Sequence, residues 1–220
     1  MHYLFFPGKP EHILIDMDSV RGGRIEHSSL TIPVSGNPVN IPGKINNAIR
    51  LDGNRQYADV GDHGDSCFGN MKLCNHGITG SMFLNFRNFE ENMYYLTSGG
   101  GLRLYYADGK LYASVDRAGQ RWEVGIPYLR KDKWYFVEYT WHPEKGLQVY
   151  VDNKLAGDTK QSTSVPVKDF SGGHVLIGSA NPRDSDDGRR FSYANALVDE
   201  VETWLGNRDN LIAFDYIIRG

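Results

Sequence analysis

The sequence lacks several features that would assign a protein class at once. It holds only 2 cysteines in 220 residues, and its 24 Lys and Arg are scattered among 27 Asp and Glu, so no basic stripe is present to meet a nucleic-acid backbone. No run approaches the ~18 consecutive apolar residues of a transmembrane helix. The opening MHYLFFPGKPEH lacks the basic segment and the cleavage site of a secretory signal. We therefore expect no nucleic-acid partner and no membrane insertion. If the protein is exported, we expect these first residues to belong to a mature module or an excised piece of one rather than to a precursor.

Helical periodicity is also scarce, whereas turn residues and aromatic residues are abundant. The chain has 25 Gly, 13 Tyr and 10 Phe, and turn signals recur about every 8–12 residues, as in sandwiches of short antiparallel strands. One segment near the end, NRDNLIAFDYII, has the apolar spacing of a short helix. No linker or change in composition divides the chain. The sequence therefore predicts a single all-β domain over residues 1–220.

The clearest hairpin is GLRLYYADGKLYASVD, residues 101–116. Asp108-Gly109 supplies the two positive-φ positions of a type I′ turn, which pairs Ala107 with Lys110 and sets the register behind it. Counting back from the turn, one face is apolar and belongs to the core. The opposite face carries Arg103 and Tyr105 against Ser114 and Tyr112, so we expect it to be wet or functional.

Five strings in sequence resemble one fold family. They are GKINNAIRLDGNRQYADVG, ITGSMFLNF, KWYFVEYTWHPEKGLQVYVDNKLAG, HVLIGSA and ALVDEVETW, and together they cover about residues 43–220. Their order resembles that of laminin-G-like and pentraxin-like domains of the concanavalin A-like superfamily. The resemblance implies a jelly-roll β-sandwich of two antiparallel sheets with about six or seven strands each. It also implies a secreted or cell-surface module that binds glycans, matrix or other proteins.

Both cysteines lie in GDSCFGNMKLCNHG, just before a predicted core strand. In several laminin-G-like relatives a short cysteine loop occupies this place, so the resemblance implies a Cys67–Cys74 disulfide. A zinc site made with His63 and His76 is an alternative, although the spacing lacks the close ligand pairs of known zinc motifs; free buried thiols are another. A disulfide favours an oxidising, extracellular location.

Asp184, Asp186 and Asp187, in the loop NPRDSDDGRR, suit calcium as hard oxygen ligands. In the pentraxin resemblance this loop carries calcium ligands, so calcium is the candidate cofactor. However, Ala180 and Asn181 stand where pentraxins have an acidic and amide cluster. The alternative is a solvated acidic loop neutralised by the neighbouring arginines.

Two other acidic groupings receive different interpretations. Asp52 and Asp199 lie on segments that run close together in related jelly rolls, and we expect them to close turns or pin strands. Glu200 and Glu202 alternate on one predicted strand, as carboxylates of glycoside hydrolases do, but the next alternate position back is Val198. The set is incomplete, so we expect no enzyme and keep a glycoside hydrolase only as an alternative.

Sugar binding is most concretely suggested by Tyr105, Tyr112 and Arg103, because aromatic rings stack on sugars while polar groups reach the hydroxyls. Trp122 is a second candidate platform. The alternative is that the tyrosines only pair structurally across strands. The sequence thus predicts an extracellular recognition or adhesion module for carbohydrate or glycosaminoglycan, assisted by calcium; the competing class is a protein-interaction or matrix-assembly module.

Overall fold

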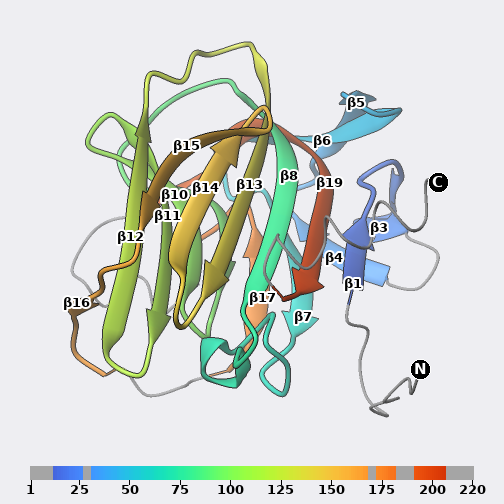
Figure 1. Cartoon of the computed structure of the whole chain (residues 1–220). Helices are drawn as coiled ribbons and strands as arrows, with labels where there is room; N and C mark the ends of the chain where they lie inside the picture. Colours follow the sequence, from blue (N-terminus) through green and yellow to red (C-terminus); the bar gives the residue numbers. More distant parts are fainter. Residues whose placement is uncertain (1–11, 27–30, 168–171, 182–190, 207–220) are drawn as a thin grey trace, which may run out of the picture.

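The computed structural model describes residues 12–26, 31–167, 172–181 and 191–206, and the account below concerns these residues. They form two large, mostly antiparallel sheets that face each other, so the predicted jelly-roll β-sandwich is confirmed (Figure 1). The described helical segment is η1 (Met71–Leu73), a single 3₁₀ turn. No helix in the described part of the chain is long and apolar enough to cross a membrane.

The first sheet has the strand order β15-β14-β13-β8-β19-β6-β5, with β1 paired to β19. Its members are β1 (His12–Ile15), β5 (Val39–Pro42), β6 (Asn47–Asp52), β8 (Ile78–Phe86), β13 (Trp134–His142), β14 (Gly146–Val151), β15 (Lys154–Thr159) and β19 (Asn195–Leu205).

The second sheet has the order β16-β12-β11-β10-β9-β17-β7-β4-β3-β2, and β18 pairs in parallel with β9. Its members are β2 (Val20–Arg21), β3 (Arg24–Glu26), β4 (Thr31–Ser35), β7 (Tyr57–Asp62), β9 (Met93–Ser98), β10 (Leu102–Ala107), β11 (Lys110–Arg117), β12 (Gln120–Pro127), β16 (Thr163–Ser164), β17 (His174–Ile177) and β18 (Ser192–Tyr193). In the described residues the sheets have 8 and 11 strands, more than the six or seven expected, because several short strands extend their edges.

The core fills the space between the sheets, and alternation along each strand supplies it. On β13, Tyr135, Val137, Tyr139 and Trp141 are buried and face the partner sheet, whereas the residues between them lie on the outside. Trp141 meets Trp122 of the second sheet edge to face, with ring centroids 5.3 Å apart. This contact between large apolar rings holds the two layers together.

The predicted 101–116 hairpin has the expected register. Tyr105 pairs with Tyr112 and Ala107 with Lys110, and Asp108 and Gly109 have φ values of 47° and 75°. The apolar face packs in the core as predicted. The expectation of a wet opposite face is wrong for its inner part: Arg103 is 4% exposed, Tyr105 9% and Ser114 0%. The reason is that the rings of Tyr94 and Tyr112 stack on Tyr105 and that Arg103 is bonded to Asp116.

The other strands expected from the sequence are also present. The run KWYFVEYTWHPEKGLQVYVDNKLAG forms β13, β14 and β15, with the tight turn at Asp152-Asn153. HVLI forms the buried strand β17, and ALVDEVETWL lies in β19. The short helix expected in NRDNLIAFDYII lies outside the described residues.

Candidate functional site: a tyrosine row on the second sheet

The site begins with three tyrosine rings that cross the outer face of neighbouring strands. Tyr94 on β9, Tyr105 on β10 and Tyr112 on β11 are stacked, with centroids 5.3 and 5.4 Å apart and 20° between planes. Ala180 is buried with the row, and Phe191 packs against it. Tyr94 and Tyr105 are buried, whereas Tyr112 is only partly buried. The row therefore presents a partly open ring at the Tyr112 end.

A glycine lets the last ring lie flat on the sheet. Gly125 on β12 pairs with Tyr112, and a Cβ added at Gly125 would lie 2.7 Å from Tyr112 Cε1. That separation is shorter than carbon atoms tolerate, so only glycine leaves room for the ring in this position. Gly125 thus continues the row onto a fourth strand and positions Tyr112.

A buried ion cluster lies beside the row. Asp116 accepts bonds from Arg121 Nε and Nη2 at 2.6 and 2.8 Å and from Arg103 Nη1 at 2.9 Å. Burial tends to raise the pKa of Asp116, but the bonds from Arg121 and Arg103 outweigh it, so this pKa lies below its usual value. The same bonds raise the pKa of Arg121. The cluster is rigid, because each guanidinium group is fixed by a shared carboxylate.

Glu123 connects the row to the ion cluster. The hydroxyl of Tyr105 donates a 2.7 Å hydrogen bond to Glu123 Oε2, and burial together with this carboxylate raises the pKa of Tyr105. Glu123 itself is exposed. Ser114 on β11 pairs with Arg103 of β10 on one side and with Glu123 of β12 on the other. Its Oγ is buried and has no hydrogen-bond partner among the described residues. The face therefore combines an aromatic platform, an exposed carboxylate and a partly exposed guanidinium.

Of the residues expected to bind ligand, the structure brings Arg103, Tyr105 and Tyr112 together and separates Trp122 from them. Trp122 is 8% exposed and belongs to the core between the sheets. Its ring contacts Trp141, so the expectation that it offers a second platform is wrong. Asp116, Arg121, Glu123 and Gly125 share this face but are not among the residues predicted to bind ligand. Their alternation on β11 and β12 was a signal, because positions paired with Tyr112 and Ser114 must share their face.

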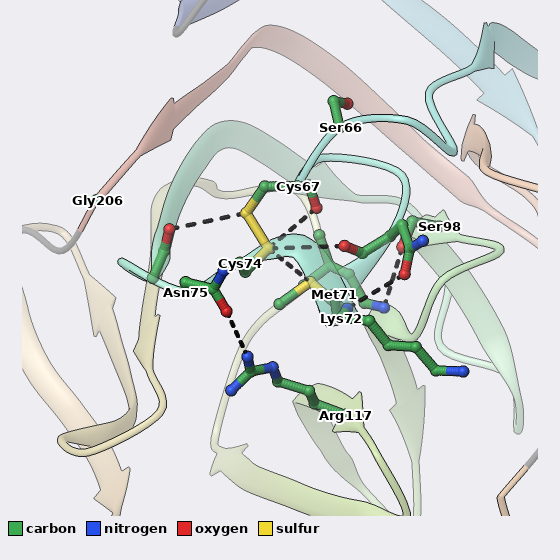
Figure 2. Close-up of a disulfide and its surroundings, with 12 residues drawn as sticks. Ser66, Cys67, Met71, Lys72, Cys74, Asn75, Ser98, Arg117 and Gly206 are labelled. Atoms are coloured by element: carbon green, nitrogen blue, oxygen red, sulfur yellow. Dashed lines mark hydrogen bonds between the residues drawn. A yellow bond between two sulfur atoms is a disulfide. The ribbon is translucent and has the colours of Figure 1, made fainter. Parts of the chain in front are cut away.

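The cysteine loop closes as the resemblance implied. Cys67 and Cys74 form a disulfide, which excludes the zinc alternative because neither sulfur is a free thiolate (Figure 2). His63 instead packs against Phe68, and His76 is exposed. Arg117 at the end of β11 donates to Asn75 Oδ1 at 2.8 Å, which joins the loop to the second sheet.

A small pocket lies where this loop meets the second sheet. Asn70, Lys72, Asp116, Arg117 and Gly119 line it, with Val165 and Val167 opposite. Asp116 is shared with the ion cluster, so the pocket lies at the end of the same face.

The predicted calcium ligands Asp184, Asp186 and Asp187 lie outside the described residues. Within the described ranges, no three His, Cys, Asp or Glu side chains gather in a way that could hold a metal ion. Asn181 is 3% exposed, and its amide donates to Thr97 Oγ1 and to the carbonyl of His174. This residue is therefore part of the strand packing.

Asp52 and Asp199 each close a turn, as expected. Asp52 Oδ1 accepts from the backbone N–H of Asn54, and Asp199 Oδ2 accepts from those of Lys44 and Ile45, both at 2.8 Å. Asp52 therefore stabilises the β6–β7 connection, and Asp199 stabilises the β5–β6 connection.

Glu200 and Glu202 do not follow simple alternation. A β-bulge lies between Asp199 and Glu202, and Glu200 has the left-handed φ of 46°. Burial, and next the charge of Asp199, raise the pKa of Glu200 to about 7. Asp16, Asp18 and Glu202 contribute to the same shift. The extra residue of the bulge, which no pattern in the sequence announced, removes the basis for placing the two glutamates on one face.

Neither a model of a known protein family nor a curated protein matches the sequence. Solved structures share its fold. One is the botulinum neurotoxin type C structure whose title reports that cell entry depends on interaction with two ganglioside molecules; it has a TM-score of 0.59 and 14% identity, and the match covers 93% of this chain and 51% of that one. Another is the binding domain of Paraclostridial Mosquitocidal Protein 1, with a TM-score of 0.60 and 14% identity over 88% of this chain and 49% of that one.

In a third similar structure, the match covers most of the solved chain instead of about half of it. Domain 4 of AbnA, an extracellular GH43 arabinanase from Geobacillus stearothermophilus solved with arabinotriose, has a TM-score of 0.58 and 10% identity over 87% of this chain and 88% of that one. By contrast, the chain spans about half the length of the toxin binding domains that it matches. At these identities the likeness establishes the jelly-roll β-sandwich, and the narrower laminin-G-like assignment does not follow from it.

Proposed function

We propose that this protein is a carbohydrate-binding module and that a glycan lies on the outer face of β10, β11 and β12, over Tyr112. The observation that carries the proposal is the partly open Tyr112 ring held flat over Gly125, next to the exposed carboxylate of Glu123. A flat ring contacts the apolar face of a pyranose or furanose, while nearby acceptors and donors bind its hydroxyls.

Rigidity of the face supports this proposal. Tyr112 stacks on Tyr105, Tyr105 is fixed by Glu123, and Arg121 is fixed by Asp116. A site whose groups are already ordered loses little conformational entropy when a ligand binds. A similar fold, Domain 4 of AbnA, was solved in complex with arabinotriose.

The proposal is tested by titrating a ¹⁵N-labelled sample with a panel of oligosaccharides and following its backbone amide resonances. We expect the largest shifts at Tyr112, Glu123 and Gly125, because a glycan over Tyr112 would lie within contact of all three. Shifts confined to the outer face of β8, β13 and β14 would refute this site. They would favour the other sheet, where Phe83 and Phe136 form a partly exposed aromatic pair.

The same proposal includes an extracellular, non-catalytic module related to the laminin-G-like and pentraxin-like domains. The disulfide supports the extracellular part, since such bonds persist in oxidising compartments. Calcium remains a prediction for Asp184, Asp186 and Asp187. Thermal unfolding with calcium and with EDTA tests it: a rise in Tm that Asp186→Ala/Asp187→Ala abolishes would support a metal there, and an unchanged Tm would rule out a stabilising one.

A further inference from the structure

We propose that the glycan bound at this face is neutral, and that the site discriminates against acidic glycans such as uronates and sulfated polymers. This inference rests on the proposed function and narrows its ligand class. It comes from how the charges of the face are already paired.

Both arginines of the face bind the buried carboxylate of Asp116. Arg121 makes two bonds to Asp116, and Arg103 makes a third. The side chains of Arg103, Asp116 and Arg121 are 5%, 12% and 23% exposed. An acidic sugar would have to compete with a buried, doubly bonded carboxylate that is held in place by the sheet, so these guanidinium groups cannot act as the unpaired cations that anionic polymers require.

The face also carries an exposed negative charge on β12. Glu123 is exposed and lies on β12 one alternate position from Gly125, over which the Tyr112 ring rests. Its carboxylate repels a uronate or sulfate group placed on the ring, and this repulsion is strongest at low ionic strength. Lys110, at the tip of the β10–β11 turn, is an exposed cation on the same face, and its Cδ lies 3.1 Å from the position of a Cβ at Gly125, so its stem runs beside the Tyr112 ring. The charge of Glu123 offsets this single cation, and one exposed lysine on a flexible stem contributes little attraction in water.

The same groups suit a neutral sugar. The carboxylate of Glu123 accepts hydrogen bonds from sugar hydroxyls, and it retains this capacity because Tyr105 occupies only one of its oxygens. Arg121 uses Nε and Nη2 for Asp116, and its Nη1 has no partner among the described residues. Glu123 therefore offers an acceptor, and Arg121 offers a donor, to the hydroxyls of an uncharged sugar on this face.

The test compares neutral and acidic polysaccharides by affinity electrophoresis and calorimetry at about 50 and 300 mM NaCl, where screening differs strongly. The neutral set is arabinan, xylan and β-glucan, and the acidic set is heparin, chondroitin sulfate and polygalacturonate. We expect the wild type to bind a neutral polymer with less than about twofold change between the two salt concentrations, and to bind the acidic polymers at least tenfold more weakly. Glu123→Gln should gain affinity for the acidic set, and that gain should fall with salt. Asp158→Asn on β15, also an exposed acid, is the control for the loss of one negative charge and should show no gain.

Asp116→Asn should produce a larger gain in affinity for the acidic polymers, because it releases both arginines. Since Asp116 is buried, this substitution endangers folding, and Glu123→Gln, at an exposed position, tests the inference without it. Acidic polymers that bind the wild type more tightly than any neutral one, with loss of affinity in Tyr112→Ala, would overturn the inference while the proposed function stands. If no polymer binds, or if Tyr112→Ala leaves binding unchanged, the proposed function falls and takes the inference with it.

Discussion

At the scale of single residues, the contact between Gly125 and Tyr112 decides how the aromatic platform is presented. A methyl group at Gly125 would meet Tyr112 Cε1 at 2.7 Å and Cζ at 3.1 Å, so the ring must tilt away from the sheet. We expect Gly125→Ala to weaken glycan binding about tenfold, or ~1.4 kcal/mol, while the protein stays folded. Calorimetry together with thermal unfolding measures both quantities. Unchanged affinity in a folded variant would show that the flat ring is not the platform.

Glu200 makes a separate prediction about pH. Its pKa in the folded protein is raised to about 7 from an ordinary value of 4.5, so its protonated form favours the folded state. This contribution is complete below about pH 4.5 and is lost as the pH rises through about 7. Glu200→Gln should therefore stabilise the protein at pH 8 and change little at pH 4. We expect about 1 kcal/mol, less than the full shift implies, because Glu200 is partly exposed and screened.

Urea denaturation at the two pH values measures this difference. The matched control is Glu144→Gln, which removes an exposed carboxylate in the β13–β14 turn. A gain for Glu200→Gln that is equal at pH 4 and pH 8 would contradict the assignment.

At the scale of structural elements, the disulfide loop contributes by restricting the unfolded chain. Closing the segment between Cys67 and Cys74 is worth about 2.5 kcal/mol on the loop-entropy estimate. Cys67→Ser/Cys74→Ser should lower the free energy of unfolding by roughly that amount, with glycan binding unchanged because the loop lies away from Tyr112. Denaturant unfolding under non-reducing conditions measures the loss. A loss of binding in the folded double variant would instead place the loop in the site.

The same scale shows how far the sequence predicts the fold. The 101–116 hairpin has the predicted register, because Asp108-Gly109 determines its turn chemistry and alternation determines its apolar face. The burial of the opposite face could not be predicted, because it depends on two contacts between strands. Tyr94 stacks on Tyr105, and Asp116 accepts hydrogen bonds from two arginines. These are tertiary contacts that have no period in the sequence. Trp122 was misplaced for the same reason, since its partner Trp141 lies in the other sheet.

At the scale of the whole molecule, we propose that one sheet of the sandwich binds glycan through a preorganised face. The two sheets differ in this respect. The second sheet carries the Tyr94–Tyr105–Tyr112 row and the Asp116 cluster, whereas the outer face of β13 and β8 carries the Phe83–Phe136 pair without a comparable ion cluster among the described residues. The jelly roll supplies the platform, and the side chains that cross its strands would determine the ligand.

The affinity of Tyr112→Ala for the best-bound oligosaccharide, compared with that of Tyr150→Ala, decides whether this face binds the glycan. Tyr150 is a partly exposed tyrosine on β14 of the opposite sheet, so it controls for the loss of a ring from a strand. The account predicts that Tyr112→Ala loses at least tenfold in affinity, or ~1.4 kcal/mol, with folding preserved, and that Tyr150→Ala binds as the wild type does. Equal affinities for all three folded proteins, or a loss only in Tyr150→Ala, would contradict it.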